Sequence, residues 1–305
     1  MKLGLACGAA LTALALAGPA SAEPLPGAPD CEIFPADNVW NKRVDKLPIR
    51  KSSNRIVNAI GANLHVHADF GSGLWDGGPI GIPITVVDSS TPLSTVDFEY
   101  DDESDAGPYP IPDDVAIEGG PDADGDRHAV LVNRETCTLY ELFALYPSWS
   151  GASGAIWDLS SNALRPRGWT SADAAGLPIL PGLARYDEVA AGSITHALRF
   201  TVRRSRRAFV YPARHFASSY TNRALPPMGL RLRLRQNYPV DTHPPQARVV
   251  LRALKRYGMI VADNGSSWYV SGAPDPRWDN DDLHTLHRVK GSDFRVVDTS
   301  SLRNG

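Results

Sequence analysis

The sequence has 305 residues, of which 43% are hydrophobic and 21% charged, and its formal net charge is −3 at pH 7. This composition is typical of a globular protein. The negative charge disfavours nucleic acid as a partner, and no segment after the N-terminal region is apolar enough to span a membrane.

Residues 1–22 predict a secretory signal peptide. Lys2 provides the positive start, an alanine-rich apolar run follows, and the A-S-A pattern at 20–22 is typical of a cleavage site. The apolar run is too short to cross a membrane as a helix. We therefore expect a secreted protein in which residues 23–305 form a single β-rich domain.

Two cysteines follow the predicted signal peptide, Cys31 and Cys137. An even pair in an oxidising compartment favours one disulfide. Such a bond would close a loop of about 100 residues and stabilise the fold by roughly 4–5 kcal/mol in the chain-entropy description. Its expected role is structural, because the sequence has no C-x-x-C pair.

Short strand-like runs recur along the chain between turn signals, which the 26 glycines and 25 prolines supply throughout. Only three helical patterns stand out. The helical patterns are at 54–62, 246–258 and 279–289, and the strand-like runs are at 81–87, 95–100, 128–133, 138–145, 154–159, 195–202, 208–212, 229–235, 259–263, 267–272 and 294–298. Many short strands predict a mainly β fold, with a β-sandwich or jelly-roll-like core and a few peripheral short helices.

A first candidate site begins with alternating polar residues, His65, His67 and Asp69. Imidazole and carboxylate groups can bind zinc. The motif therefore raises a metal-dependent hydrolase as one alternative, although Phe70 stands where a metallo-β-lactamase-like site would need a further histidine.

The glycine-rich loop that follows carries Trp75 and Asp76 at its tip. A tryptophan ring can stack on a sugar ring, and a carboxylate can accept hydrogen bonds from sugar hydroxyl groups. This pair is a candidate substrate-binding site. The alternative is a packed turn with a buried tryptophan.

Asp122, Asp124 and Asp126 lie at alternate positions around a glycine. Oxygen ligands at this spacing suit calcium, although the order differs from that of an EF-hand loop. A structural calcium is thus one interpretation of this spacing, and no other cofactor is expected.

Glu118 and His128 flank the same acidic stretch. Glu118 ends a short apolar run and precedes two glycines, which is a suitable place for a general acid or base. His128 follows Arg127, whose charge would lower the pKa of the imidazole if the two side chains lie close together. Both residues are candidate catalytic groups.

Charge is segregated along the chain. Residues 97–126 hold twelve acids and no Lys or Arg, whereas residues 199–235 hold ten arginines and no acid. The two blocks either pair with each other or are solvated; alternatively, the arginines form a groove for an anionic ligand. In GLRLRLR the alternation of a strand would place Arg231, Arg233 and Arg235 in a row with about 7 Å between neighbours, which suits a uronate chain.

His215 lies in the arginine-rich block, next to Arg214. A neutral imidazole can abstract a proton while an arginine binds a uronate carboxylate, and Tyr211 or Tyr220 could supply the acid. These residues would form a lyase-type site. The alternative is a half-buried histidine in a sheet.

Asp263 follows a buried-looking run and begins a tight turn. It is a candidate second carboxylate of a glycosidase pair with Glu118, and the distance between the two would determine the stereochemistry. Alternatively, Asp263 serves only to form the turn, because Asp and Asn favour such positions. Trp268, Arg277 and Trp278 follow as candidate substrate-binding residues.

Five longer strings are distinctive. They are CEIFPADNVWN (31–41), DFGSGLWDGGPIGIP (69–83), GAIWDLSSNALRPRGWTSADAAGLPILPGLARYDEVAAG (154–192), PARHFAS (212–218) and ADNGSSWYVSGAPDPRWD (263–279). Together they resemble a family of exported bacterial proteins that is common in actinobacteria and other soil bacteria. The resemblance covers nearly all of the chain after residue 22. It implies export and a single domain, and it implies no activity and no catalytic residue.

The sequence as a whole predicts a secreted, carbohydrate-active enzyme that cleaves a polysaccharide. Cleavage would be by glycoside hydrolysis or by β-elimination on a uronate. A non-catalytic glycan- or cell-wall-binding protein is one alternative, and a metal-dependent hydrolase is another.

Overall fold

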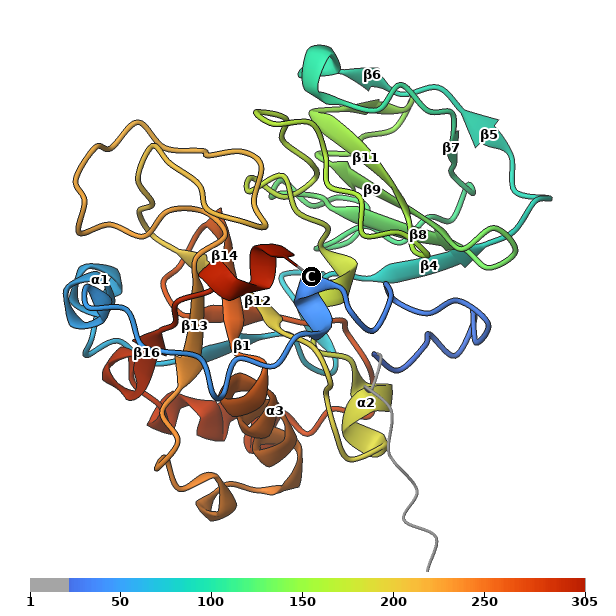
Figure 1. Cartoon of the computed structure of the whole chain (residues 1–305). Helices are drawn as coiled ribbons and strands as arrows, with labels where there is room; N and C mark the ends of the chain where they lie inside the picture. The colour runs from blue at the N-terminus through green and yellow to red at the C-terminus, as the bar shows by residue number, and fades with distance from the viewer. Residues whose placement is uncertain (1–21, 305) are drawn as a thin grey trace, which may run out of the picture.

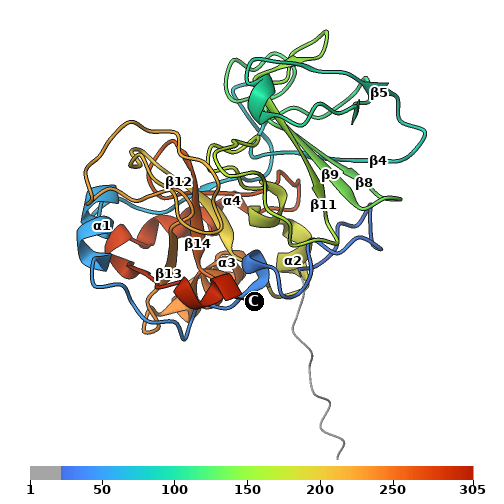
Figure 2. The ribbon, with the colours of Figure 1, turned by 45° about the horizontal axis from the view of Figure 1, so that its top comes forward.

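The computed structural model describes residues 22–304, which form two parts, each built on one main sheet (Figure 1). A rotated view shows the same two parts side by side (Figure 2). The predicted signal peptide lies outside the described residues, except for Ala22. None of the described helices has the length and hydrophobicity that a membrane crossing needs.

The first part is built on a four-stranded sheet. Its strands are β4 (Ile84–Val87), β8 (Ala129–Asn133), β9 (Thr138–Phe143) and β11 (Ser153–Asp158), in the order β11-β9-β8-β4. β4 and β8 are parallel, whereas the other neighbours are antiparallel. Every residue of β8 is buried, and successive residues such as Val130 and Leu131 belong to two different core clusters. The apolar sequence of β8 thus reflects a strand that is covered on both faces.

Six very short strands form three further pairs around this sheet. They are β2 (Leu74–Trp75) with β3 (Gly78–Pro79), β5 (Leu93–Ser94) with β7 (Tyr109–Pro110), and β6 (Asp97–Phe98) with β10 (Ser150–Gly151).

The second part is built on a six-stranded sheet with the order β1-β15-β12-β14-β13-β16. The strands are β1 (His67–Asp69), β12 (Leu198–Val202), β13 (Arg231–Leu234), β14 (Met259–Asn264), β15 (Tyr269–Ser271) and β16 (Phe294–Val296). β1 comes from the N-terminal third of the chain but pairs in parallel with β15, near the C-terminus. The strand order therefore brings distant segments of the sequence into one sheet.

Four α-helices accompany the sheets. α1 (Ser53–Ile60) contacts β16, α3 (Pro245–Arg256) contacts β13, and α2 (Tyr186–Ala190) and α4 (Asn280–His284) both contact α3. The 3.6-residue pattern of α3 places Val250, Leu251 and Leu254 in the core. Three of these helices match the predicted helical patterns, whereas α2 was not predicted.

The fold is mixed α/β, with 24% strand and 19% helix. Within the described residues the sheets are open, and no sheet closes or curls, so the expected sandwich is not shown. Strands form in ten of the eleven predicted runs. The exception is 208–212, where only an isolated bridge joins Phe209 to Met228. Pro212 lacks the backbone N–H that a continuing strand needs.

The predicted disulfide between Cys31 and Cys137 is present, with a sequence separation of 106. It joins the N-terminal segment to the residue that precedes β9. The sulfur atoms sit next to the core cluster that covers one face of the four-stranded sheet.

The predicted row of arginines on β13 does not form an open groove. Arg231 is 1% exposed. Its guanidinium group donates to the backbone oxygens of Val39 (2.6 Å), Lys42 (2.8 Å) and Tyr257 (2.7 Å). Arg233 is also buried. All four residues of β13 are buried, so both of its faces are covered, and Arg231 binds the N-terminal segment instead of an external anion.

A buried carboxylate connects β9 to the chain around residue 180. Glu141 is fully buried and accepts hydrogen bonds at 2.9 Å from the backbone N–H groups of Ile179 and Leu180. Burial raises the pKa of Glu141 to about 7, although these hydrogen bonds act in the opposite direction. The contact satisfies two amide donors that would otherwise be unpaired in the core.

Candidate functional site

Three adjoining cavities form a cleft that is lined by residues from both parts of the chain. A central cavity of about 230 Å³ adjoins a cavity of about 570 Å³ that contains His67 and another of about 420 Å³ that contains His215. We call these the central, His67 and His215 cavities. The central cavity shares Asp69, Glu118 and Tyr269 with the His67 cavity, and Asp126, Asp263 and Asn264 with the His215 cavity.

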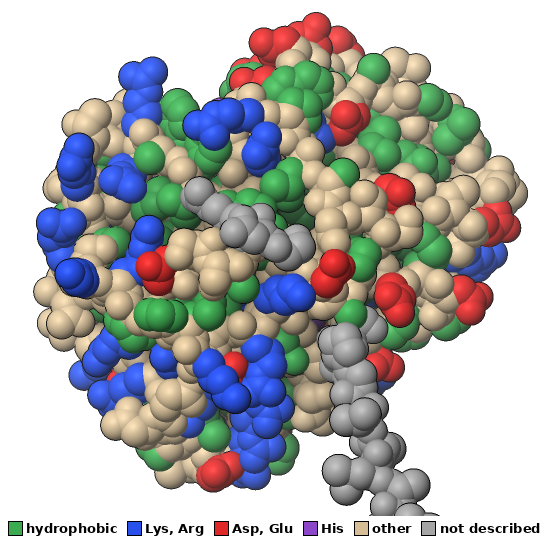
Figure 3. Space-filling model, in the orientation of Figure 1, with side chains coloured by type: hydrophobic (Ala, Val, Ile, Leu, Met, Phe, Trp, Pro, Cys, Tyr) green, Lys and Arg blue, Asp and Glu red, His purple; other side chains and the backbone are tan. Residues whose placement is uncertain are grey.

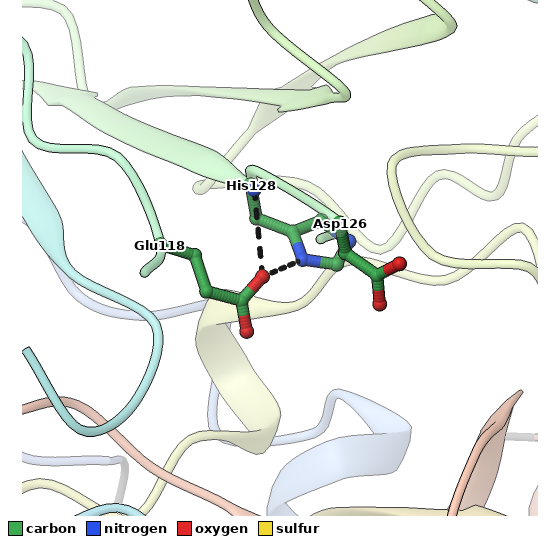
Figure 4. A group of neighbouring side chains, drawn as sticks. All are labelled: Glu118, Asp126 and His128. Carbon is green, nitrogen blue, oxygen red and sulfur yellow. Dashed lines mark hydrogen bonds and ion pairs between the residues drawn. The ribbon is translucent and has the colours of Figure 1, made fainter. Parts of the chain in front are cut away.

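Glu118 and His128 form a close pair in the central cavity. His128 is the residue before β8, and its Nδ1 atom lies 2.5 Å from Oε2 of Glu118 (Figure 4). Its Nε2 atom lies 3.0 Å from the backbone oxygen of Ala172. Because a carboxylate and a carbonyl both accept hydrogen bonds, the ring is protonated on both nitrogens.

The electrostatics of this pair agree with an imidazolium–carboxylate contact. Burial alone would lower the pKa of His128, but the charge of Glu118 and the hydrogen bond to it raise that pKa to about 9. Burial alone would raise the pKa of Glu118, but the charge of His128 and its hydrogen bond hold the pKa below its ordinary value. Glu118 is therefore ionised at neutral pH.

Arg199 connects the six-stranded sheet to the same cavity. Its Nε and Nη2 atoms donate to Asp173 at 2.8 and 3.0 Å, and its Nη1 atom donates to the hydroxyl group of Ser271 at 2.6 Å. Arg199 and Asp173 are both buried. This bidentate pair fixes the guanidinium group in one orientation.

Asp263, on β14, is the second carboxylate of the central cavity. Its side chain is 19% exposed, and its Oδ2 atom lies 3.4 Å from Nη2 of Arg199. Burial and the negative charge of Asp173 raise the pKa of Asp263 to about 7, against the opposing effect of Arg199. The pKa values of Asp263 and Glu118 are thus shifted in opposite directions, which is the arrangement of an acid and a base in one site.

Asp126 completes the polar group around His128. Ligand atoms of Glu118, Asp126 and His128 lie within 4.8 Å of one another, close enough to hold a metal ion. Because Nε2 of His128 donates to a carbonyl, only Nδ1 could bind a metal, and binding would displace its proton. Asp122 and Asp124, the other predicted calcium ligands, are exposed and are not part of this group.

His215 lines the cavity next to the central one, but the lyase-type group predicted around it is not assembled. The Nδ1 atom of His215 donates to the backbone oxygen of Ala174 at 2.9 Å. Arg214 donates instead to the backbone oxygen of Arg165 and lines a different pocket, which also contains Tyr211. Tyr220 is exposed and lines neither of these cavities.

Two of the three predicted sugar-binding tryptophans are buried in the core. Trp268 is fully buried, stacks between Phe200 and Phe294, and donates to the backbone oxygen of Gly61. Trp278 is 3% exposed. Neither ring can stack on a sugar, because neighbouring side chains already cover its faces.

Trp75, the last residue of β2, lies at the edge of the cleft. The side chain is 78% exposed and lines the His67 cavity. Asp76 is exposed beside it and does not line the cavity. Arg277 is an exposed residue paired with Asp275 and Asp187, so it takes no part in the cleft.

The histidine motif of β1 meets a partner from the far end of the sequence. The Nδ1 atom of His67 lies 2.9 Å from Nε2 of His287, and both rings line the His67 cavity with His284. Nδ1 of His65 instead contacts the backbone oxygen of His287. Asp69 lines both the His67 and the central cavities. The three predicted zinc ligands are therefore not one cluster among the described residues.

Sequence reasoning missed Arg199, Asp173 and Ser271. Arg199 offered a signal, because it interrupts the apolar strand run HALRFTV, where a buried arginine needs a partner. Nothing in the sequence around Asp173 or Ser271 identifies either as that partner.

No protein-family model matches the chain, and no similar curated protein or solved structure was found. The chemistry of the cleft is therefore inferred from its own residues.

Proposed function

We propose that the protein is a secreted glycoside hydrolase that cleaves a polysaccharide in the cleft. The observation that carries this proposal is the pair Asp263 and Glu118, two carboxylates in one cavity whose pKa values are shifted apart. Asp263 donates its proton to the glycosidic oxygen as the bond to the anomeric carbon breaks. Glu118 acts on the opposite side, as the nucleophile or as the base that activates water.

The neighbouring residues have positioning roles in this mechanism. His128 keeps Glu118 ionised through the contact at 2.5 Å. Asp173 fixes Arg199, and its charge adds to burial in raising the pKa of Asp263, so that Asp263 still holds a proton near neutral pH. The acid and the base thus keep different protonation states at the same pH.

The shape of the cleft favours a polymeric substrate. Three cavities adjoin one another, and aromatic side chains lie along them: Trp75 and Tyr269 in the His67 cavity, and Tyr100 and Phe143 in the His215 cavity. Such rings stack on the apolar faces of sugars. An open cleft of this kind can bind the interior of a chain on both sides of the cleaved bond. Hydrolysis is favoured over β-elimination, because Arg214 lies in a different pocket from His215.

A metal-dependent hydrolase is the second candidate, and one observation favours it. Glu118, Asp126 and His128 present ligand atoms within 4.8 Å of one another. In that case Glu118 would bind the metal instead of the substrate. Elemental analysis of the purified protein and the effect of a chelator on activity distinguish the two candidates.

The direct test is a screen of the purified protein on plant, fungal and bacterial polysaccharides. New reducing ends without an ultraviolet-absorbing unsaturated product identify a hydrolase, and the anomer formed first distinguishes a nucleophilic from a basic role of Glu118. Asp263→Asn and Glu118→Gln should each lower kcat by about 100-fold or more.

Asp76→Asn is the matched control, because Asp76 is exposed and outside the cleft. Retention of a polysaccharide in affinity electrophoresis, with no product and with no effect of the two cleft substitutions, would instead identify a non-catalytic glycan-binding protein. That outcome would overturn the proposal.

A further inference from the structure

A pocket of about 370 Å³ outside the cleft is surrounded by positive charge. It shares no lining residue with the three cavities of the cleft. Its charged residues come from α1 and the segment that leads into it, from the loop after β12 and from the C-terminal segment. We call it the basic pocket. Its charged lining residues are Arg50, Lys51, Arg55, Arg206, Arg223 and Asp298.

The cations of the basic pocket outnumber its one carboxylate, Asp298, whose pKa the charge of Arg50 helps to lower. Among the residues that the structure describes, none of the five forms an ion pair. Other arginines of the same arginine-rich block are paired: Arg199 with Asp173 and Arg235 with Asp293. In Figure 3, Lys and Arg side chains gather on the side of the molecule where α1 lies, and Asp and Glu gather on the other part.

Arg206 brings an unpaired donor to the basic pocket. Its Nε atom is buried and has no hydrogen-bond partner. Burial lowers the pKa of this guanidinium group, and the positive charges of Arg223, Arg50 and Arg55 lower it further. A buried donor without an acceptor, among like charges, is costly unless an anion occupies the pocket.

The start of α1 lies at the same pocket. Ser52, the residue before the helix, lines the pocket, and its side chain makes no capping hydrogen bond. The first backbone N–H groups of a helix have no acceptor within it, and the helix dipole favours negative charge at this end. The N–H group of Ser53 is bonded to the backbone oxygen of Arg50 (2.9 Å), so the helix contributes its dipole to a pocket whose cationic side chains come from separate segments.

We propose that the basic pocket binds a phosphoryl group. Five cations against one carboxylate exceed what a singly charged carboxylate ligand would neutralise, whereas a phosphoryl group carries up to two negative charges and accepts bidentate hydrogen bonds from arginine. A helix N-terminus is itself a common phosphate site. The inference does not rest on the proposed function, because the basic pocket is separate from the cleft.

The experiment is a titration of the full-length protein with inorganic phosphate at low, constant ionic strength. Calorimetry measures the affinity, and thermal unfolding measures the change in Tm. Binding should raise the Tm. Arg55→Glu and Arg223→Glu should each weaken binding by about tenfold or more, because each removes a charge-assisted contact and adds repulsion. Arg204→Glu is the matched control, since Arg204 is exposed on the same loop and does not line the pocket.

A second variant keeps the inference testable if the charge reversals impair folding. Arg223→Gln removes one of the like charges around Arg206, so it should raise the Tm in the absence of phosphate and reduce the shift that phosphate produces. If the arginines were only solvated, Arg223→Gln would change neither the Tm nor the shift that phosphate produces. An absent phosphate effect, or equal losses in Arg204→Glu, would overturn the inference, as would equally tight binding of acetate.

A polymer of glycerol phosphate is the second probe and distinguishes the source of the phosphoryl group. Tighter binding per phosphoryl group than that of inorganic phosphate would identify a polymer ligand, and equal binding a free phosphate. Either outcome supports a phosphoryl site. Cleavage of a polysaccharide should be unchanged in Arg223→Glu. A failure of phosphoryl binding can therefore be distinguished from a failure of the proposed hydrolase activity.

Discussion

The Nη2 atom of Arg199 lies 3.4 Å from the Oδ2 atom of Asp263. The same guanidinium group is much more tightly held by Asp173, at 2.8 and 3.0 Å. Burial and the negative charge of Asp173 raise the pKa of Asp263 to about 7, and the more distant contact with Arg199 only partly opposes them. One buried carboxylate thus adds to the effect of burial on the protonation of another that faces the cleft.

This relationship predicts the pH dependence of activity. A general acid with a pKa of about 7 loses its proton as the pH rises, so kcat/KM should fall on the alkaline side with a midpoint near 7. Asp173→Asn removes the repulsion and frees Arg199 to pair with Asp263. Both effects lower the pKa of Asp263, so the alkaline midpoint should move to lower pH. The position of the midpoint is measured independently of the amount of folded protein. An unchanged midpoint in Asp173→Asn would exclude Asp263 as the acid.

The Glu118–His128 pair predicts a pH dependence of stability. The pKa of His128 is raised from 6.5 to about 9 in the folded protein. The contact between protonated His128 and Glu118 therefore adds on the order of 3 kcal/mol to the free energy of unfolding. This contribution is complete below pH 6.5 and is lost as the pH rises through 9.

The measurement is urea unfolding of the wild type and of His128→Gln between pH 6 and 9.5. The difference in unfolding free energy should shrink as the pH rises. His65→Gln, at an exposed position, is the control and should show no such trend. A difference that stays constant with pH would mean that His128 is neutral in the folded protein.

Glu141 predicts a large loss of stability on truncation. Glu141→Ala leaves the N–H groups of Ile179 and Leu180 without an acceptor in the core. The free energy of unfolding should fall by roughly 2–4 kcal/mol. Glu135→Ala is the control, because Glu135 accepts a hydrogen bond from Ser89 at the surface, and the change there should be about 0.5 kcal/mol or less. Equal effects of the two substitutions would contradict the structural role of Glu141.

The disulfide predicts a difference between the oxidised and reduced protein. Cys31 and Cys137 are 106 positions apart, so the bond should stabilise the fold by roughly 4–5 kcal/mol in the chain-entropy description. Denaturant unfolding with and without a reductant measures this difference. The Cys31→Ser/Cys137→Ser double variant should match the reduced wild type and should not respond to the reductant. Equal stability of the oxidised and reduced protein would contradict this prediction.

Local elements were predictable because local patterns encode them. The apolar run of β8 and the periodicity of α3 are visible in the sequence, and both elements form where expected. The arrangement of the strands was not predictable. The edge strand β1 has only three residues, His-Ala-Asp, and its partner lies near the C-terminus.

The site was partly predictable for the same reason. Glu118, His128 and Asp263 were identified as acid–base candidates next to turns, and they line one cavity. The tryptophans show the limit of such reasoning, because residue type does not encode exposure: Trp268 is fully buried, whereas Trp75 is 78% exposed. Alternation along β13 suggested an exposed face for Arg231, but that rule fails when both faces of a strand are covered.

The pairing of β1 with β15 also has a consequence for how the protein is made. A ribosome releases the chain from its N-terminus, so residues 67–69 leave the tunnel long before residues 269–271 exist. Likewise, the backbone oxygens of Val39 and Lys42 cannot accept their hydrogen bonds from Arg231 until that residue has been synthesised. Early segments thus remain without their final neighbours until synthesis is nearly complete, and a chain that is cut short before residue 230 should be a substrate for proteases.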